Sequence, residues 1–223
     1  GLGYKAALSS GLIEIASTSG TSDDRVSVVW HQPWWDRSER EAYRIHPALA
    51  PFAGRPHREA VLTTPVCVGN VCHMGNASLK ERTVDGILFL NQTAEPATWT
   101  DGTVRRMAEE LAGFAPDILE ADPAYLALLS RACLRSGIPL LQPSCIVLTY
   151  EYPSRLHCRW IARAFPGVPV ASSYGSTETG TVFIQCAHGT FHQNTATCHA
   201  EIQPLRVGVG EGGVGRLLVS TLD

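Results

Sequence analysis

Two short segments far apart in the chain carry residue types that suit a nucleoside triphosphate. The first, residues 17–22, reads Ser-Thr-Ser-Gly-Thr-Ser and surrounds one glycine with hydroxyl groups. Such a loop can wrap phosphate oxygens, because glycine lets backbone N–H groups approach them closely. The second, residues 172–178, reads Ser-Ser-Tyr-Gly-Ser-Thr-Glu and offers a flat ring, hydroxyl groups and a carboxylate. Together the two segments predict a site for ATP and its metal ion.

Composition limits the partners and the compartment that we expect. The chain has 223 residues, of which 44% are hydrophobic and 17% charged, and its formal net charge is −3. This charge gives no bulk attraction to nucleic acid or anionic lipid, so we expect neither as a partner. No apolar run approaches the roughly 18 residues of a membrane-spanning helix. Seven cysteines, an odd count, favour free thiols and a cytoplasmic location, and a homodimer is left open.

Alternating strand and helix patterns must position the two segments. Asp122 and Pro123 begin the clearest predicted helix, and Gly137 ends it. Asp101 is expected to cap the start of the preceding helix in the chain, the one that begins near residue 101. Apolar periodicity predicts strands at 12–16, 26–30, 60–64, 87–90, 145–149, 168–172, 181–185, 197–204 and 216–222. It predicts helices at 38–43, from 101 to either 111 or 114, at 123–136 and at 153–165.

The segment 145–172 is typical of a β-α-β unit, whose strands lie parallel with a right-handed crossover. Ligands collect at the carboxyl ends of such strands, and residues 150–151 and 173–175 follow those ends on neighbouring loops. Further along, the two strands that flank a His-rich turn, 181–185 and 197–204, are expected to pair antiparallel. The sequence therefore predicts an α/β fold, with a layered α/β/α core and mixed, largely parallel sheets in residues 1–180, and a β-rich hairpin region in residues 181–223.

An ordered series of short motifs resembles the adenylate-forming enzymes, and within them most closely the phenylacetate-CoA ligase-like branch. The resemblance covers most of the chain, from about Ile15 to Asp223, and the order of the motifs is more specific than any one of them. It implies the core of the large lobe of these enzymes. The motifs are PDIL at 116–119, DPAYL at 122–126, GIP at 137–139, YE at 150–151, YGSTE at 174–178 and GRLLV at 215–219.

The resemblance implies a two-step reaction. A carboxylate, expected to be aromatic or amino-acid-like, attacks the α-phosphate of ATP to give an acyl-adenylate and pyrophosphate. The thiol of coenzyme A or of a carrier-protein pantetheine then takes the acyl group. In this reaction Thr177 would bond the α-phosphate and Glu178 would hold Mg²⁺. The other implied site residues are Thr18, Ser19, Gly20, Thr21 and Ser22 for the phosphates, Tyr150, Glu151, Ser173, Tyr174 and Gly175 for the nucleotide, and Asn70, Cys72 and His73 for the acyl substrate.

Two departures from the family pattern favour an alternative. Asp23 and Asp24 stand where the family usually has glycine and a basic residue, and two carboxylates repel a triphosphate. Either both point away and Arg25 takes the basic role, or ATP binding is weakened. The resemblance also implies that the lid domain with its catalytic lysine lies outside these residues. A non-catalytic ligand-binding or interaction module is therefore the competing hypothesis, whereas a P-loop NTPase is excluded because the Walker lysine pattern is absent.

A third group of residues could hold zinc. Cys186, His188, His192 and Cys198 would give two thiolates and two imidazoles, which suit tetrahedral Zn²⁺. The spacing is not that of a standard zinc finger, although a similar feature occurs in some members of the same ligase branch, where it looks structural. A structural zinc ion, a metal-free turn and a catalytic metal all stay open, and His199 or Cys158 could replace Cys198.

Three tryptophans follow soon after the hydroxyl-rich loop. Trp30, Trp34 and Trp35 could pack in the interior or form a wall of the acid pocket. The sequence leaves both interpretations open.

Overall fold

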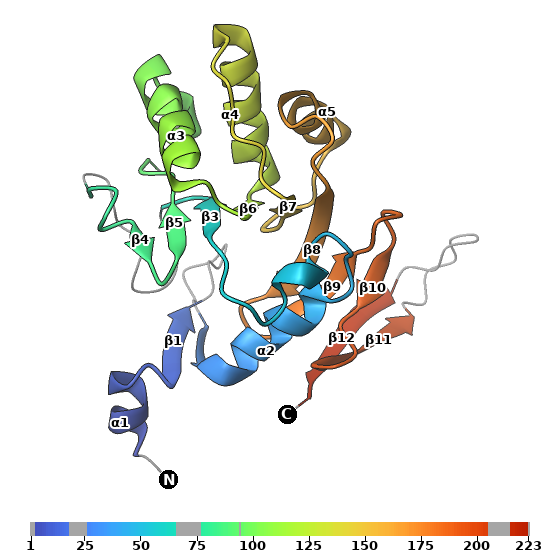
Figure 1. The fold of residues 1–223 in the computed structure, drawn as a ribbon. Helices are drawn as coiled ribbons and strands as arrows, with labels where there is room; N and C mark the ends of the chain where they lie inside the picture. Colours follow the sequence, from blue (N-terminus) through green and yellow to red (C-terminus); the bar gives the residue numbers. More distant parts are fainter. Residues whose placement is uncertain (1–2, 18–25, 66–76, 94, 205–214, 223) are drawn as a thin grey trace. The chain divides into compact units, whose positions relative to one another are not determined.

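The computed structural model describes residues 3–17, 26–65, 77–93, 95–204 and 215–222 (Figure 1). The chain forms two compact units that alternate along the sequence. The first unit contains residues 1–16, 27–53 and 174–223, and the second contains residues 17–26 and 54–173. Neither unit coincides with the ranges 1–180 and 181–223. Within the described ranges, no helix is both long enough and apolar enough to cross a membrane.

The sheet of the second unit has the strand order β8-β7-β6-β3-β5-β4. All neighbouring strands in it run parallel except the edge strand β4, which is antiparallel to β5. This confirms the predicted α/β fold with a largely parallel sheet. The strands are β3 (Glu59–Leu62), β4 (Thr83–Val84), β5 (Ile87–Phe89), β6 (Ile118–Ala121), β7 (Cys145–Leu148) and β8 (Val170–Ser176), the last of which continues into the first unit.

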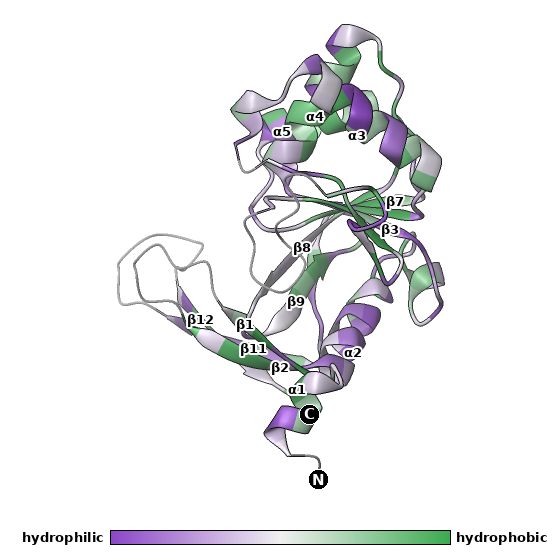
Figure 2. Cartoon of the chain, turned by 90° about the vertical axis from the view of Figure 1, so that its left-hand side faces the viewer, coloured by the Kyte–Doolittle hydropathy of each residue, from purple (hydrophilic) through white to green (hydrophobic). Residues whose placement is uncertain are grey.

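Three helices cover one face of this sheet, as Figure 1 shows: α3 (Asp101–Phe114), α4 (Pro123–Ser136) and α5 (Arg155–Ala164). Because strand side chains alternate between faces, every second residue of a strand points toward the helices. The apolar colouring of β3 and β7 in Figure 2 follows from this burial. The core between sheet and helices includes Ala60, Leu62, Leu88, Met107, Leu111, Leu119, Leu126, Leu129, Ile146, Leu148, Ile161 and Phe165.

Local capping explains where these helices begin and end. Asp122 accepts hydrogen bonds from the first backbone N–H groups of α4, and Gly137 ends the helix with a φ of +64°, as predicted. The predicted cap of α3 was wrong by one residue. Thr100, not Asp101, has the extended backbone of a cap, and its hydroxyl accepts from the backbone N–H of Thr103. A short 3₁₀ helix, Pro96–Thr98, precedes this cap.

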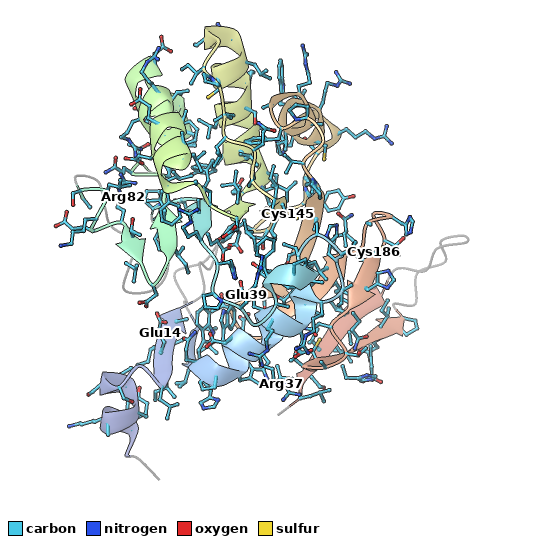
Figure 3. The ribbon with its side chains drawn as sticks, viewed as in Figure 1. Glu14, Arg37, Glu39, Arg82, Cys145 and Cys186 are labelled. Carbon is cyan, nitrogen blue, oxygen red and sulfur yellow. The ribbon has the colours of Figure 1, made fainter. Side chains whose placement is uncertain are left out.

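A buried arginine ties β4 and β5 to α3 (Figure 3). Arg82 is 1% exposed, and its guanidinium donates to both carboxylate oxygens of Glu110 and to the carbonyl of Phe89. Glu110 also accepts from Arg106, one turn earlier on α3. A buried charge is tolerated when it is paired and hydrogen-bonded in this way. The network therefore stabilises one side of the second unit.

The first unit begins with helix α1 (Tyr4–Ser9) and the paired strands β1 (Ile13–Ser17) and β2 (Ser27–His31), which flank the hydroxyl-rich segment as predicted. Helix α2 spans Gln32–Tyr43 and begins six residues before the predicted start. The proline in its first turn is the reason, because that position needs no backbone N–H donor. A 3₁₀ helix, Ala50–Phe52, ends this part of the unit.

The strands at the C-terminal end pair differently from the prediction. Strand β9 (Gly180–Gln185) pairs antiparallel with β10 (Phe191–Gln193), and β11 (Cys198–Pro204) pairs with β12 (Gly215–Thr221). The expected pairing of 181–185 with 197–204 is therefore wrong. A turn in which Cys186 N–H bonds the carbonyl of Thr190 brings the chain back at once, so β10 occupies the edge of β9. The hairpin region itself is confirmed.

Candidate functional site

The Tyr-Gly-Ser-Thr-Glu motif lies where β8 turns into β9. Strand β8 continues to Ser176, so Tyr174 and Gly175 lie on a strand and not on the expected loop. The backbone N–H of Thr179 donates to the carbonyl of Ser176 at 3.2 Å and closes a turn, which we call the Thr-Glu turn, residues 176–179. The hydroxyl of Ser176 bonds that of Thr179 at 2.9 Å and accepts from the N–H of Glu178. These local bonds close the turn that carries Thr177 and Glu178.

Close packing of β8 on β9 explains the glycine of the motif. A Cβ atom at Gly175 would lie 2.2 Å from the carbonyl oxygen of Gly180, well inside a van der Waals contact. Gly180 has a φ of +63°, and a Cβ there would meet the hydroxyl of Ser38 at 2.8 Å. Both positions therefore require glycine. The narrow hairpin holds the Thr-Glu turn at its tip.

The side chains of the motif are available to a ligand. Tyr174 is 52% exposed, and its ring touches Phe183 of β9 in a tilted arrangement with centroids 6.0 Å apart. Such a ring is not a core aromatic and can stack on a base. Glu178 is exposed, and within the described residues its carboxylate has neither an ion pair nor a hydrogen-bond partner. An unpaired carboxylate beside a hydroxyl is a donor set that suits Mg²⁺.

Backbone strain marks the second group of predicted residues, in the second unit. Tyr150 follows β7 and has a φ of +73°, a region that favours glycine. The N–H of Glu151 donates to the carbonyl of Thr149 at 2.9 Å, so Tyr150 is the central residue of a γ-turn. Such strain persists only where the surroundings fix it, and it clusters at functional sites. Since Leu148 lies opposite Ser172 in register, the turn that follows β7 lies next to Ser173 of the longer strand β8, at the carboxyl edge of the sheet.

Glu120 holds the strained tyrosine and was missed in the sequence. The phenol of Tyr150 donates to Oε1 of Glu120 on β6 at 2.6 Å. Desolvation of the hydroxyl and the charge of Glu120 both raise the pKa of Tyr150 above its usual value, although the residue as a whole is 57% exposed. Glu120 is the polar residue in an otherwise buried strand, Ile118–Ala121, and that interruption was the available signal. Glu151 lies 3.9 Å from the imidazole of His157 and stays exposed.

The structure thus gathers the predicted residues into two groups, each described within its own unit. Tyr174, Gly175, Thr177 and Glu178 come together in the first unit, and residues 150, 151 and 173 lie along one sheet edge in the second. The remaining residues of the phosphate segment and of the predicted acyl pocket lie outside the described ranges. They are Thr18, Ser19, Gly20, Thr21, Ser22, Asp23, Asp24, Asn70, Cys72 and His73.

The predicted zinc ligands do not form a metal centre as placed. No three of Cys186, His188, His192 and Cys198 have ligand atoms within 4.8 Å of one another among the described residues. The thiol of Cys198 is buried and donates to the carbonyl of Asn194 at 3.4 Å, and burial raises its pKa. Zinc binds the thiolate and not the thiol, so this cysteine fits the role poorly here. Cys186, labelled in Figure 3, lies in the turn between β9 and β10.

Comparisons with known proteins support the fold and not a particular reaction. No protein-family model matches the chain, and a search of curated proteins finds no match. Among solved structures, 2-hydroxyisobutyryl-CoA ligase in complex with 2-HIB-AMP superposes with a TM-score of 0.60 at 13% identity, covering 98% of this chain and 45% of that one. The amide bond synthetase McbA from Marinactinospora thermotolerans gives 0.56 at 16% identity, covering 93% and 40%.

A third solved structure, VinN with L-aspartate, gives a TM-score of 0.55 at 15% identity and covers 93% of this chain and 49% of that one. The chain therefore spans less than half the length of each of these three proteins. At identities this low, the likeness concerns the path of the backbone. The chain has the fold of part of the adenylate-forming enzymes.

Proposed function

We propose that this chain activates a carboxylic acid with ATP to form an acyl-adenylate and then passes the acyl group to a thiol. The observation that carries the proposal is the exposed, unpaired Glu178 beside Thr177 at the tip of the β8–β9 hairpin. The proposal also rests on the fold that the chain shares with solved ligases, one of which was solved in complex with 2-HIB-AMP and CoA. The neighbours support a carboxylic acid in general, since one holds 2-HIB-AMP and another L-aspartate, and the narrower class, aromatic or amino-acid-like, comes from the sequence resemblance.

In the first unit, the side chains of Tyr174, Thr177 and Glu178 would bind the nucleotide. The ring of Tyr174 would stack on the adenine, which its 52% exposure allows. In the second unit, residues 150, 151 and 173 at the carboxyl edge of the sheet are proposed as nucleotide-binding residues in their own right. The hydroxyl of Thr177 would donate to the α-phosphate, where negative charge increases in the transition state. The backbone N–H groups and hydroxyls of residues 18–22 are proposed to hold phosphate oxygens.

Glu178 would hold Mg²⁺, which when bound supplies positive charge to the phosphate oxygens. In the first step the carboxylate oxygen forms a bond to the α-phosphorus, and the bond from that phosphorus to the β-phosphate oxygen breaks. Pyrophosphate leaves with the electron pair. In the second step a thiolate attacks the acyl carbon and AMP leaves, giving a thioester. Asn70, Cys72 and His73 would shape the acyl pocket, and the thiol would belong to coenzyme A or to a carrier protein.

Acid-dependent exchange of labelled pyrophosphate into ATP tests the proposal. Exchange requires the reversible first step, so it reports adenylate formation without the acceptor thiol. We expect Glu178→Ala to abolish exchange and Glu201→Ala, an exposed glutamate on β11, to leave it unchanged. An unaltered rate in Glu178→Ala would remove Glu178 from the site.

A second candidate is a binding module without turnover. The pair Asp23-Asp24 favours it, because two carboxylates next to a triphosphate oppose its binding in a reactive position. The same experiment separates the two candidates. Nucleotide binding without exchange, for every acid tried, would support the module.

A structural zinc ion at Cys186, His188, His192 and Cys198 is a separate proposal that comes from the residue pattern. Ligation would require Cys198 to lose its proton and its bond to Asn194. Metal analysis of the purified chain tests it, and a zinc content near zero would end it.

A further inference from the structure

The indole of Trp30 bonds directly to the backbone of the Thr-Glu turn. Its Nε1–H donates to the carbonyl oxygen of Thr177 at 2.5 Å, across 147 positions of sequence and within the first unit. We infer that Trp30 is a positioning residue, which holds Thr177 and Glu178 in the orientation that a nucleotide and its metal need. This inference rests on the proposed function, and no feature of the sequence assigns that role to Trp30.

Trp30 is itself held in place by its neighbours. Its ring stacks on that of Trp35, with centroids 4.0 Å apart and an angle of 17° between the planes. Trp35 packs in turn against Trp34, whose Nε1–H donates to the carbonyl of Leu222 at 3.0 Å. Stacked rings with anchored N–H groups lose little freedom when they make one more contact. The indole N–H of Trp30 is therefore preorganised toward the turn.

The turn depends on an outside contact for its orientation. Its internal bonds, between Ser176 and Thr179, close the turn but do not fix the tip relative to the rest of the unit. Below the tip, the buried hydroxyl of Ser38 on α2 accepts from the backbone N–H of Thr181, and Asn194 donates to the carbonyl of Ser38 at 2.8 Å. These bonds hold the start of β9, directly after the turn. The bond from Trp30 holds the turn itself.

Trp30 lies close in sequence to the predicted phosphate segment, which relates this contact to nucleotide binding. Trp30 lies on β2, the strand that follows the hydroxyl-rich residues 18–22. One hydrogen bond thus links the strand that leaves the predicted phosphate segment to the turn that carries the predicted metal ligand. A small displacement of the turn would move Thr177 and Glu178 away from the phosphates of a bound nucleotide. Hydrogen bonds and metal contacts weaken steeply as their distances and angles depart from the optimum.

The test compares variants of the full chain in two measurements. Trp30→Phe keeps a stacking ring and removes the N–H donor, whereas Trp35→Phe keeps the donor and changes the stack. Trp99→Phe removes an indole donor to Thr93 in the second unit and serves as the remote control. Calorimetric titration gives the affinity of each variant for ATP with Mg²⁺ and for adenosine. Amide hydrogen exchange measured by NMR reports on Glu178 and Thr179 without any ligand.

We expect Trp30→Phe to weaken binding of ATP with Mg²⁺ by about tenfold and to leave adenosine binding unchanged, because adenosine has no phosphate for the turn to meet. The amides of Glu178 and Thr179 should exchange faster in this variant alone. Equal weakening for both ligands, or unchanged exchange at these amides, would show that Trp30 only supports the fold. If the wild-type chain binds no nucleotide, the proposed function fails. In that case the amide exchange rates of Glu178 and Thr179 alone test whether Trp30 holds the turn in place.

Discussion

The phenol of Tyr150 and the carboxylate of Glu120 join the ends of neighbouring strands β7 and β6 through a 2.6 Å hydrogen bond. Tyr150 lies at the centre of a γ-turn with a φ of +73°, so this bond holds a backbone shape that a non-glycine residue seldom adopts. The candidate site in the second unit therefore depends on a contact between residues 30 positions apart.

Replacing Tyr150 with phenylalanine should remove this bond and keep the ring. At pH 8 we expect the free energy of unfolding to fall by about 1 kcal/mol, since the lost bond has a charged acceptor and a partly exposed donor. The folded pKa of Tyr150 is raised, so the unfolded chain releases this proton first as the pH rises. The stability that the tyrosine contributes is therefore present below about pH 10 and lost above it.

Urea titrations of the wild-type chain and Tyr150→Phe at pH 8 and above pH 10 check this prediction. The difference in free energy between the two chains should shrink at the higher pH. A difference that stays constant or grows would mean that the phenol does not bond Glu120 in its protonated form.

Replacing Gly175 with alanine should strain the β8–β9 hairpin, because the new Cβ would lie 2.2 Å from the carbonyl oxygen of Gly180. We expect a loss of about 1–3 kcal/mol in the free energy of unfolding. Gly113→Ala on α3 is the matched control, since no atom lies within 4 Å of its Cβ position. That variant should gain about 0.5–1 kcal/mol from helix propensity. Equal stability of the two variants, measured by urea unfolding, would contradict the tight hairpin.

Replacing Arg82 with methionine should be among the most damaging single changes in the second unit. The side chain is 2% exposed and bonds Glu110, which is 13% exposed, so its removal leaves a largely buried carboxylate with Arg106 as its remaining cation. We expect a loss of about 3 kcal/mol. Arg44→Ala, which breaks an exposed pair with Glu41, should cost less than about 1 kcal/mol. Similar losses in both variants would show that the Arg82 network contributes no more than a surface pair.

The cysteines of the second unit should differ sharply in reactivity. Burial raises the pKa of Cys145 to about 12, whereas Cys158 is exposed on α5. Because the thiolate is the reactive form, iodoacetamide at pH 8 should label Cys158 and leave Cys145 unmodified in the folded chain. Mass spectrometry locates the label, and both cysteines should react in concentrated urea. Labelling of Cys145 at a similar rate without urea would show that β7 is not buried as described.

Local signals explain which parts of the fold could be predicted. Asp122, Pro123 and Gly137 define α4 because capping, first-turn and stop residues act within a few positions of the chain. The pairing of β9 with β10 was missed, because the choice between two possible partner strands depends on a turn geometry that the composition of residues 186–190 does not specify. Strand pairing is decided by contacts across the fold, and apolar alternation reports only that a strand exists.

The site divides in the same way. The motif at residues 174–178 was identified from its residue types, and the structure places it at the end of β8 and in the turn that follows. The partners that hold the site, Glu120 and Trp30, were missed as such. Both act through contacts between distant positions, Glu120 with Tyr150 and Trp30 with Thr177. A glutamate in a strand and a tryptophan near a loop have many ordinary explanations, so only the fold identifies these contacts.

Calorimetric titration with ATP, in Mg²⁺ and in EDTA, tests most directly whether the Thr-Glu turn binds a nucleotide and its metal. The wild-type chain should bind ATP about tenfold more tightly with Mg²⁺ than in EDTA, and Glu201→Gln should keep that difference. Glu178→Gln should abolish it. Absence of ATP binding by the wild-type chain, or a metal-dependent difference that survives in Glu178→Gln, would contradict the account.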